Sequence, residues 1–119
     1  MGTIGGEALK GHLDLILLSA LEQGPAYGYL IVSQIEEGSE GRLRLSDGTI
    51  YPALHRLERA KLLTSYYEVN AGRRRRVYQL TSAGTSELER LKSEWETFAT
   101  AVHHLIEGKH ETVSSSRRA

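Results

Sequence analysis

Apolar side chains recur along this chain with helical spacing in four stretches, which are separated by segments containing glycine and proline. Residues three or four positions apart lie on one face of a helix, so this spacing indicates amphipathic helices. We therefore predict helices over residues 8–21, 27–37, 46–61 and 82–107. Between the third and fourth of these helices the pattern changes to β-prone runs.

The two β-prone runs predict a hairpin. They are SYYEV (residues 65–69) and RVYQL (residues 76–80), and they flank a turn signal at residues 70–72. Four consecutive arginines, residues 73–76, stand at this turn. Three helices followed by such a hairpin predict a mainly α fold of the α+β class, a winged helix-turn-helix with a two-stranded wing.

The third predicted helix has one apolar and one polar face. Ile50, Leu54 and Leu57 recur at helical spacing, and Ser46 or Asp47 can cap the N-terminus of the helix. Such a helix can lie in the major groove of DNA, while the hairpin reaches phosphates or the minor groove beside it. The opposite, polar face carries Thr49, His55, Arg56 and Arg59.

The fourth predicted helix carries an apolar seam with alternating spacings of three and four, which is typical of a helix that packs against another helix. A winged-helix core is already closed by three helices and the wing, so we expect the seam to meet a second chain. The alternative is that it folds back on its own domain. The first helix is apolar on more than one side, which also favours a partner chain. The predicted dimer interface comprises Leu9, Leu13, Leu91, Trp95, Phe98, Val102 and Leu105.

A length of 119 residues predicts one domain with one modest core. We assign residues 8–81 to the winged helix-turn-helix and residues 82–107 to the dimerisation helix. The Gly-rich residues 1–7 and the polar residues 108–119 are expected to be disordered tails.

The net charge of the chain is zero, but the charges are unevenly distributed. Residues 42–76 carry nine basic and three acidic side chains, whereas residues 1–41 carry one lysine and six acids. A basic centre between acidic flanks is a localised electrostatic footprint of the kind that nucleic-acid-binding proteins have. The alternative is an ordinary solvated charged face.

The sequence offers little for catalysis or metal binding. Without cysteine there is no disulfide and no thiolate metal site, and His103 and His104 are adjacent, so they point to different sides of a helix. No nucleophile motif or Gly-rich phosphate loop is present, so we expect no enzyme activity, no metal and no cofactor. No apolar run has the length of a membrane helix and no signal peptide is evident, so we expect a soluble cytoplasmic protein without membrane contact.

The motifs SDGTIYPALHRLERAKLL, GRRRRVYQLTSAG and LSALEQGPAYGYLIVSQIE resemble the signature of the PadR family of bacterial transcriptional regulators. The resemblance covers roughly residues 9–107. It implies that the third helix and the basic wing contact operator DNA. Lys10, near the start of the first helix, is a further candidate for a phosphate contact. The residues carried over from the family are Ser46, Thr49, Tyr51, His55, Arg56, Arg73, Arg74 and Arg75.

Two of these residues have alternative roles. Arg56 can read a guanine with two hydrogen bonds or hold a phosphate, and phosphate contacts are the commoner kind in protein–DNA complexes. Tyr51 can donate its hydroxyl to a phosphate, or its ring can pack into the core. Arg76 begins the predicted returning strand and is expected to point away from DNA.

The resemblance also implies an effector site. Small PadR members hold flat aromatic compounds between two protomers, sandwiched by a tryptophan of the last helix, and Trp95 in SEWETF matches that position. Lys92 stands where the drug-binding members have an aromatic residue, so a cation there would favour an acidic ligand or fill the cavity. The other positions that the resemblance places in this site are Leu15, Ser19, Leu88 and Ala99.

Together these features predict a ligand-responsive, homodimeric repressor that binds double-stranded DNA at a near-palindromic operator. A small aromatic effector at the dimer interface would favour dimers whose half-site spacing does not fit DNA. The alternative function is a winged-helix module that binds a protein partner and has no specific affinity for DNA.

Overall fold

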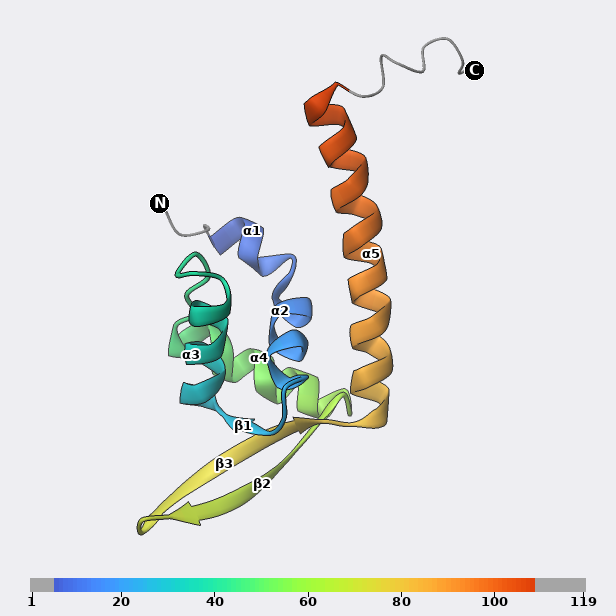
Figure 1. The fold of residues 1–119 in the computed structure, drawn as a ribbon. Coiled ribbons are helices and arrows are strands. Elements are labelled where there is room, and N and C mark those ends of the chain that lie inside the picture. Colours follow the sequence, from blue (N-terminus) through green and yellow to red (C-terminus); the bar gives the residue numbers. More distant parts are fainter. Residues whose placement is uncertain (1–5, 109–119) are drawn as a thin grey trace. The chain divides into compact units, whose positions relative to one another are not determined.

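The computed structural model describes residues 6–108, and its elements form a winged helix-turn-helix followed by a long helix (Figure 1). The contacts divide these residues into two compact units, one ending at Leu88 and the other starting at Glu89. The mainly α fold with a wing and a long last helix is thus confirmed. The elements are α1 (Gly6–Lys10), α2 (Leu13–Leu21), β1 (Ala26–Tyr27), α3 (Gly28–Gly38), α4 (Asp47–Arg59), β2 (Leu63–Asn70), β3 (Arg73–Leu80) and α5 (Ser82–Glu107).

The first predicted helix is interrupted, and the single helix over residues 8–21 was wrong. Gly11 and His12 separate α1 from α2, and the His12 amide closes a turn by donating to the Leu9 carbonyl at 3.0 Å. Glycine lowers helix stability by about 1 kcal/mol relative to alanine, which favours a break here. Of the predicted disordered tails, Gly6 and its neighbour belong to α1, Gly108 forms a turn, and the rest lies outside the described residues.

The wing contains a third strand that the sequence did not predict. The sheet has the order β1-β3-β2 and is antiparallel, with Ala26 opposite Tyr78 and Tyr27 opposite Val77. β2 and β3 are joined by Ala71 and Gly72, which have φ values of 54° and 78°. Two left-handed residues make the tight turn whose twist matches that of a hairpin. The predicted two-stranded wing is the β2–β3 hairpin. It belongs to a three-stranded sheet, because the short strand β1 pairs with β3 (Figure 1).

The core of the first unit lies between α2, α3, α4 and the sheet. Each of the three helices buries part of its predicted apolar stripe in this core, and Leu88 in α5 completes the set. This core fixes the direction of α4, since four of its residues are buried in it. The largest fully buried side chains are Tyr78, Leu17, Leu18, Ile31, Ile50, Leu54, Leu57, Leu63 and Leu88.

The last helix begins and ends where the sequence predicted, at Ser82 and Glu107. Thr81 caps it, because its Oγ1 accepts a hydrogen bond from the Gly84 amide at 3.0 Å and donates one to the Lys61 carbonyl at 2.7 Å. Capping by Thr81 ties the start of α5 to the loop before β2. No helix among residues 6–108 combines the length and apolar composition that a bilayer span requires.

Gly84 is the point of closest approach between α5 and this loop, and its substitution is our first prediction. A Cβ atom at Gly84 would overlap the Leu62 carbonyl oxygen, which is backbone and cannot rotate away. We therefore expect Gly84→Ala to lower the free energy of unfolding by about 1–3 kcal/mol, the usual cost of overpacking. Urea unfolding measures this, with exposed Ser86→Ala as the control that should change stability by less than about 0.5 kcal/mol. A Gly84→Ala protein as stable as the control would contradict this packing.

The second unit consists of the part of α5 after Leu88. Along it, Trp95, Phe98 and Leu105 expose 43%, 59% and 66% of their surface in the single chain. The rings of Trp95 and Phe98 lie side by side, with centroids 6.2 Å apart. These large apolar side chains thus stay exposed in the single chain, at the spacing that packed helices use.

Candidate nucleic-acid interface

Helix α4 presents three sides besides its buried one. Ile50, Ala53, Leu54 and Leu57 face the core. Residues spaced four, three and four apart lie together on a helix, so the exposed Gly48, Pro52, His55 and Arg59 point outward from the core. Thr49 and Arg56, seven residues apart, share one flank, while Tyr51 and Glu58 share the other.

On the first flank Arg56 is bound to Asp14 of α2. Its Nη2 lies 2.6 Å from Asp14 Oδ1, and its Nη1 lies 3.4 Å from Oδ2, so the guanidinium donates two hydrogen bonds to the carboxylate. This hydrogen bonding to Asp14 raises the pKa of Arg56. The arginine predicted to contact DNA is thus already paired within the chain.

On the second flank Glu58 binds Arg76 of β3. Arg76 Nη2 lies 2.9 Å from Glu58 Oε1, and Arg76 Nε donates to Ser65 Oγ at 3.0 Å. The Ser65 hydroxyl in turn donates to Glu58 Oε2 at 2.6 Å. This triad joins the end of α4 to both long strands of the wing. Arg76 therefore has a structural role between α4 and the sheet.

The four arginines of β3 are divided between the two faces of the sheet, because neighbouring side chains of a strand point to opposite sides. Arg74 stacks on Tyr67, with its Cζ 3.9 Å from the ring centroid. Arg75 lies over Tyr27 at 4.5 Å. Stacking on aromatic faces orients these guanidinium groups while their charges remain exposed. The four arginines are residues of strand β3 itself, whereas the sequence pattern placed them at the turn.

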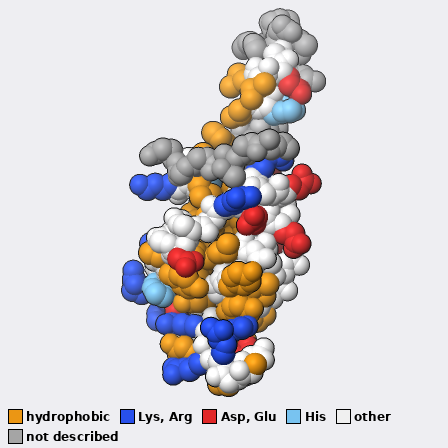
Figure 2. Space-filling model, turned by 90° about the vertical axis from the view of Figure 1, so that its left-hand side faces the viewer, with side chains coloured by type: hydrophobic (Ala, Val, Ile, Leu, Met, Phe, Trp, Pro, Cys, Tyr) orange, Lys and Arg blue, Asp and Glu red, His pale blue; other side chains and the backbone are white. Residues whose placement is uncertain are grey.

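A hollow of about 470 Å³ lies between the wing, the start of α3 and the side chain of Tyr51. Gly28 allows this approach, since a Cβ there would overlap the Tyr51 hydroxyl. Figure 2 shows Lys and Arg side chains gathered at the end of the molecule that holds the wing in Figure 1. Cations interleaved with aromatic rings suit a phosphate backbone. The hollow is lined by Tyr27, Gly28, Tyr29, Tyr51, Arg73, Arg74, Arg75 and Arg76.

The remaining residues predicted to contact DNA do not line this hollow. Lys10 ends α1 and is exposed. Ser46 is the N-cap residue of α4, where its hydroxyl donates to Thr49 Oγ1 at 3.2 Å. His55 shares a shallow hollow of about 360 Å³ with Glu58, Arg59 and Arg76.

The site also contains residues that sequence reasoning left out. Arg59 was placed on the polar face of its helix but was not carried into the set of DNA contacts, although it points outward beside His55. Tyr27 of β1 and Tyr29 of α3 also line the basic hollow, and the sequence gives no local signal for the pairing of β1 with β3.

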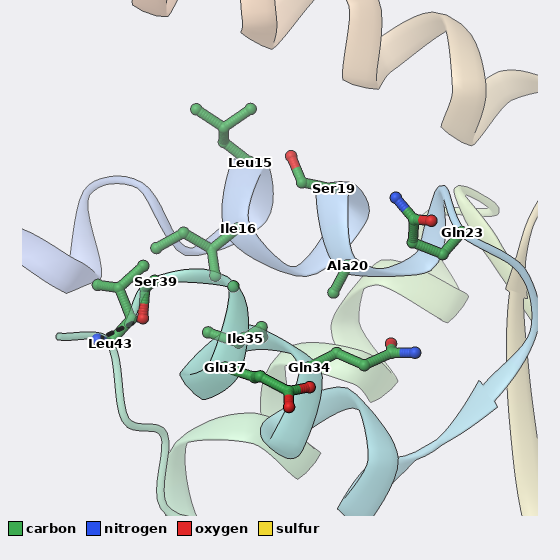
Figure 3. Close-up of a pocket in the computed structure, with 11 residues that line it drawn as sticks. Leu15, Ile16, Ser19, Ala20, Gln23, Gln34, Ile35, Glu37, Ser39 and Leu43 are labelled. Carbon is green, nitrogen blue, oxygen red and sulfur yellow. Dashed lines mark hydrogen bonds between the residues drawn. The ribbon is translucent and has the colours of Figure 1, made fainter. Parts of the chain in front are cut away.

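A second hollow, of about 570 Å³, lies between α2 and α3. Leu15 and Ser19, two of the predicted effector residues, are among its lining residues, and Figure 3 shows that their side chains point away from α3, whereas Ile16 and Ala20 of α2 point toward it. Gln34 Oε1 is buried and has no hydrogen-bond partner among the described residues. The walls are mainly apolar with a few polar groups, as in many small-molecule sites.

The other predicted effector residues lie elsewhere. Leu88 has no exposed surface and belongs to the core of the first unit. Lys92, Trp95 and Ala99 lie on the second unit, where Lys92 Nζ is 3.6 Å from Glu89 Oε2. Among residues 6–108, no three acidic or histidine side chains gather closely enough to hold a metal ion.

Comparison with known proteins agrees with this geometry. The model of the transcriptional regulator PadR-like family matches residues 17–90, more than half of the chain. A PadR family transcription regulator from Clostridium difficile R20291 is 38% identical with a TM-score of 0.72, covering 81% of this chain and 99% of that one. A transcriptional regulator from Clostridium thermocellum is 30% identical with a TM-score of 0.76, covering 82% of this chain and 96% of that one.

A second relative matches over a shorter stretch. Transcriptional regulator Rv3488 of Mycobacterium tuberculosis is 51% identical over 53 residues, which cover 44% of this chain and 50% of that protein. Family model, sequence relatives and solved structures thus agree with the winged-helix fold. The chain belongs to the PadR-like family of transcriptional regulators.

Proposed function

We propose that this DNA-binding regulator acts as a homodimeric repressor that recognises a near-palindromic operator. The observation that carries the proposal is that the arginines of β3 line hollows together with residues of α4 in one compact unit. A helix of this kind fits the major groove, and a basic wing next to it can reach the phosphates. Two copies related by a two-fold axis would read two half-sites.

The proposed contacts fall into two kinds. Thr49, His55 and Arg56 supply donors and acceptors for base edges, and Arg59 joins them from the same helix. The phosphate contacts come from the wing, from α4 with its N-cap residue, and from the end of α1, and they hold the helix in register without reading sequence. Residues proposed for phosphates are Lys10, Ser46, Tyr51, Arg73, Arg74 and Arg75.

The dimer is proposed to form through the apolar seam of α5. Trp95, Phe98 and Leu105 are exposed in the single chain and recur at the spacing of helix packing, while Leu91 and Val102 are half-buried. Burying large aromatic residues is the main source of affinity in such interfaces. Leu9 and Leu13, both half-buried near the start of the chain, are proposed to extend the interface.

An effector is part of the proposal. The exposed ring of Trp95 offers a flat aromatic surface, and Leu15 and Ser19 line a mainly apolar hollow. Lys92 and Ala99 lie close to Trp95 in the sequence of α5, and Lys92 would favour an acidic aromatic compound. Such a compound can release the repressor only if it binds the DNA-free form more tightly than the DNA-bound form.

Selection from a library of duplexes with a randomised centre tests this function. We expect the protein to enrich an inverted repeat whose half-sites are about one helical turn or a multiple of it apart. Affinity for the enriched duplex should fall steeply with salt, with a slope near −0.9 in log K against log[salt] for each phosphate contact. No enriched sequence, together with weak binding insensitive to salt, would instead favour a protein partner.

A further inference from the structure

The ion pair between Asp14 and Arg56 joins two helices that are 42 positions apart in the chain. Asp14 lies in the first turn of α2, where a carboxylate is favoured by the helix dipole, and Arg56 lies in the last turn of α4. Their side chains expose 37% and 51% of their surface. Ion pairs this exposed contribute about 0–1 kcal/mol, so stabilising the fold is a weak reason for this one.

The geometry of the pair leaves half of the guanidinium unused. Asp14 takes one hydrogen from Nη1 and one from Nη2, the two nitrogens at the tip of Arg56. An arginine has five N–H groups in a rigid plane. The N–H of Nε and the outward N–H of the neighbouring Nη therefore remain as a second parallel pair. Two parallel donors match the O6 and N7 acceptors of guanine.

The neighbouring carboxylate also changes what Arg56 offers to DNA. A cation paired with an anion has little net charge, and net charge is what attracts the phosphate backbone and releases counterions. A guanidinium group that Asp14 orients, with the N–H groups of its other edge unpaired by the carboxylate, is suited to directional hydrogen bonds instead. Arg56, in the last turn of α4, shares its flank with Thr49, which lies near the start of the same helix.

We infer that Asp14 is a specificity-determining residue, which holds the tip of Arg56 so that the free edge of the guanidinium reads a guanine. The inference rests on the proposed function, because it assigns a base reader within the same interface. Without Asp14, the Arg56 side chain is mobile and its positive charge has no neutralising partner. The phosphate backbone is then the strongest partner for it. Asp14 thereby decides between the two roles that the arginine could take.

Asp14→Asn is the direct test, because it keeps the shape of the side chain but removes its charge. Duplex selection followed by affinity measurements should show that preference at one G·C pair of each half-site falls by on the order of tenfold or more. Affinity for random duplexes should rise, and the salt slope should steepen by up to about 0.9 as Arg56 moves to a phosphate. A structural role alone would weaken binding to all sequences equally.

Glu58→Gln provides the matched control. It removes the same charge from the opposite flank of α4, where Glu58 pairs with Arg76. It should raise affinity for random duplexes but leave the preference at the G·C pair intact. Thermal unfolding of both variants shows that they are folded at the assay temperature.

A double-mutant cycle with Arg56→Lys shows whether Asp14 acts through Arg56. Lysine keeps the charge but has no fork, so Arg56→Lys should lose the same base preference, and Asp14→Asn should then have no further effect on it. The inference is overturned if Asp14→Asn leaves the preference unchanged, or reduces it equally in the Arg56→Lys background. If the wild-type protein itself prefers no sequence, the proposed function fails and this inference with it.

Discussion

Replacing Arg73, Arg74 and Arg75 together by alanine should weaken binding to every DNA duplex by on the order of a thousandfold. The three guanidinium groups line the basic hollow beside α4, and two of them are oriented by stacking on Tyr67 and Tyr27. Hydrogen bonds to charged groups contribute about 1.5 kcal/mol or more each, so three losses add up to about 4.5 kcal/mol. The salt slope should flatten by about 0.9 for each lost phosphate contact.

Operator and random duplexes should be affected alike, because phosphate contacts carry no sequence information. Titrations of both duplexes over a salt series measure the effect. The control is Arg90→Ala/Lys92→Ala, which removes positive charges from α5 and should leave the salt slope nearly unchanged. A triple variant with the slope of the wild type would place the wing away from the phosphates.

Phe98→Asp should convert the proposed dimer into monomers. Phe98 exposes 59% of its surface in the single chain, beside the ring of Trp95, in the middle of the seam. Loss of a buried phenylalanine costs about 3–5 kcal/mol, and a buried unpaired carboxylate adds to this. The dimer dissociation constant should therefore rise by on the order of a hundredfold to a thousandfold, which sedimentation over a concentration series measures.

Thr100→Asp is the matched control, because it introduces the same charge two residues away on the side of α5 opposite the seam. It should sediment as the wild type does. Binding of Phe98→Asp to an operator should lose its two-fold character, since monomers occupy half-sites independently. If Phe98→Asp sediments as a dimer, the seam is not the dimer interface.

Local signals in the sequence were enough for most elements. The bounds of α5 were predicted without error, because its seam and the capping residue Thr81 are both readable in the chain. Helix α4 differs from the prediction by only a few residues. The two-residue strand β1 was missed, because Ala26 and Tyr27 are extended through pairing with β3 and not through local propensity.

The candidate site was harder to predict than the fold. Helical spacing placed Arg56 on the polar side of its helix, but its partner Asp14 is 42 positions away and cannot be found from spacing. The same holds for Arg76, which was expected to point away from DNA and which binds Glu58. Pairing between distant elements decides which arginines of a basic segment remain available to another molecule, and spacing along the chain carries no information about it.

The core and one ion pair hold α4 in place, and other side chains of the helix are free to face another molecule. The core holds the inner side, Arg76 binds Glu58 on one flank, and Asp14 orients Arg56 on the other. The side chains of Pro52, His55 and Arg59 take part in none of these anchors. During evolution, related regulators can therefore acquire new operators by exchanging these outward residues while the scaffold stays the same. A designer could use the same three positions to redirect the protein to another DNA sequence.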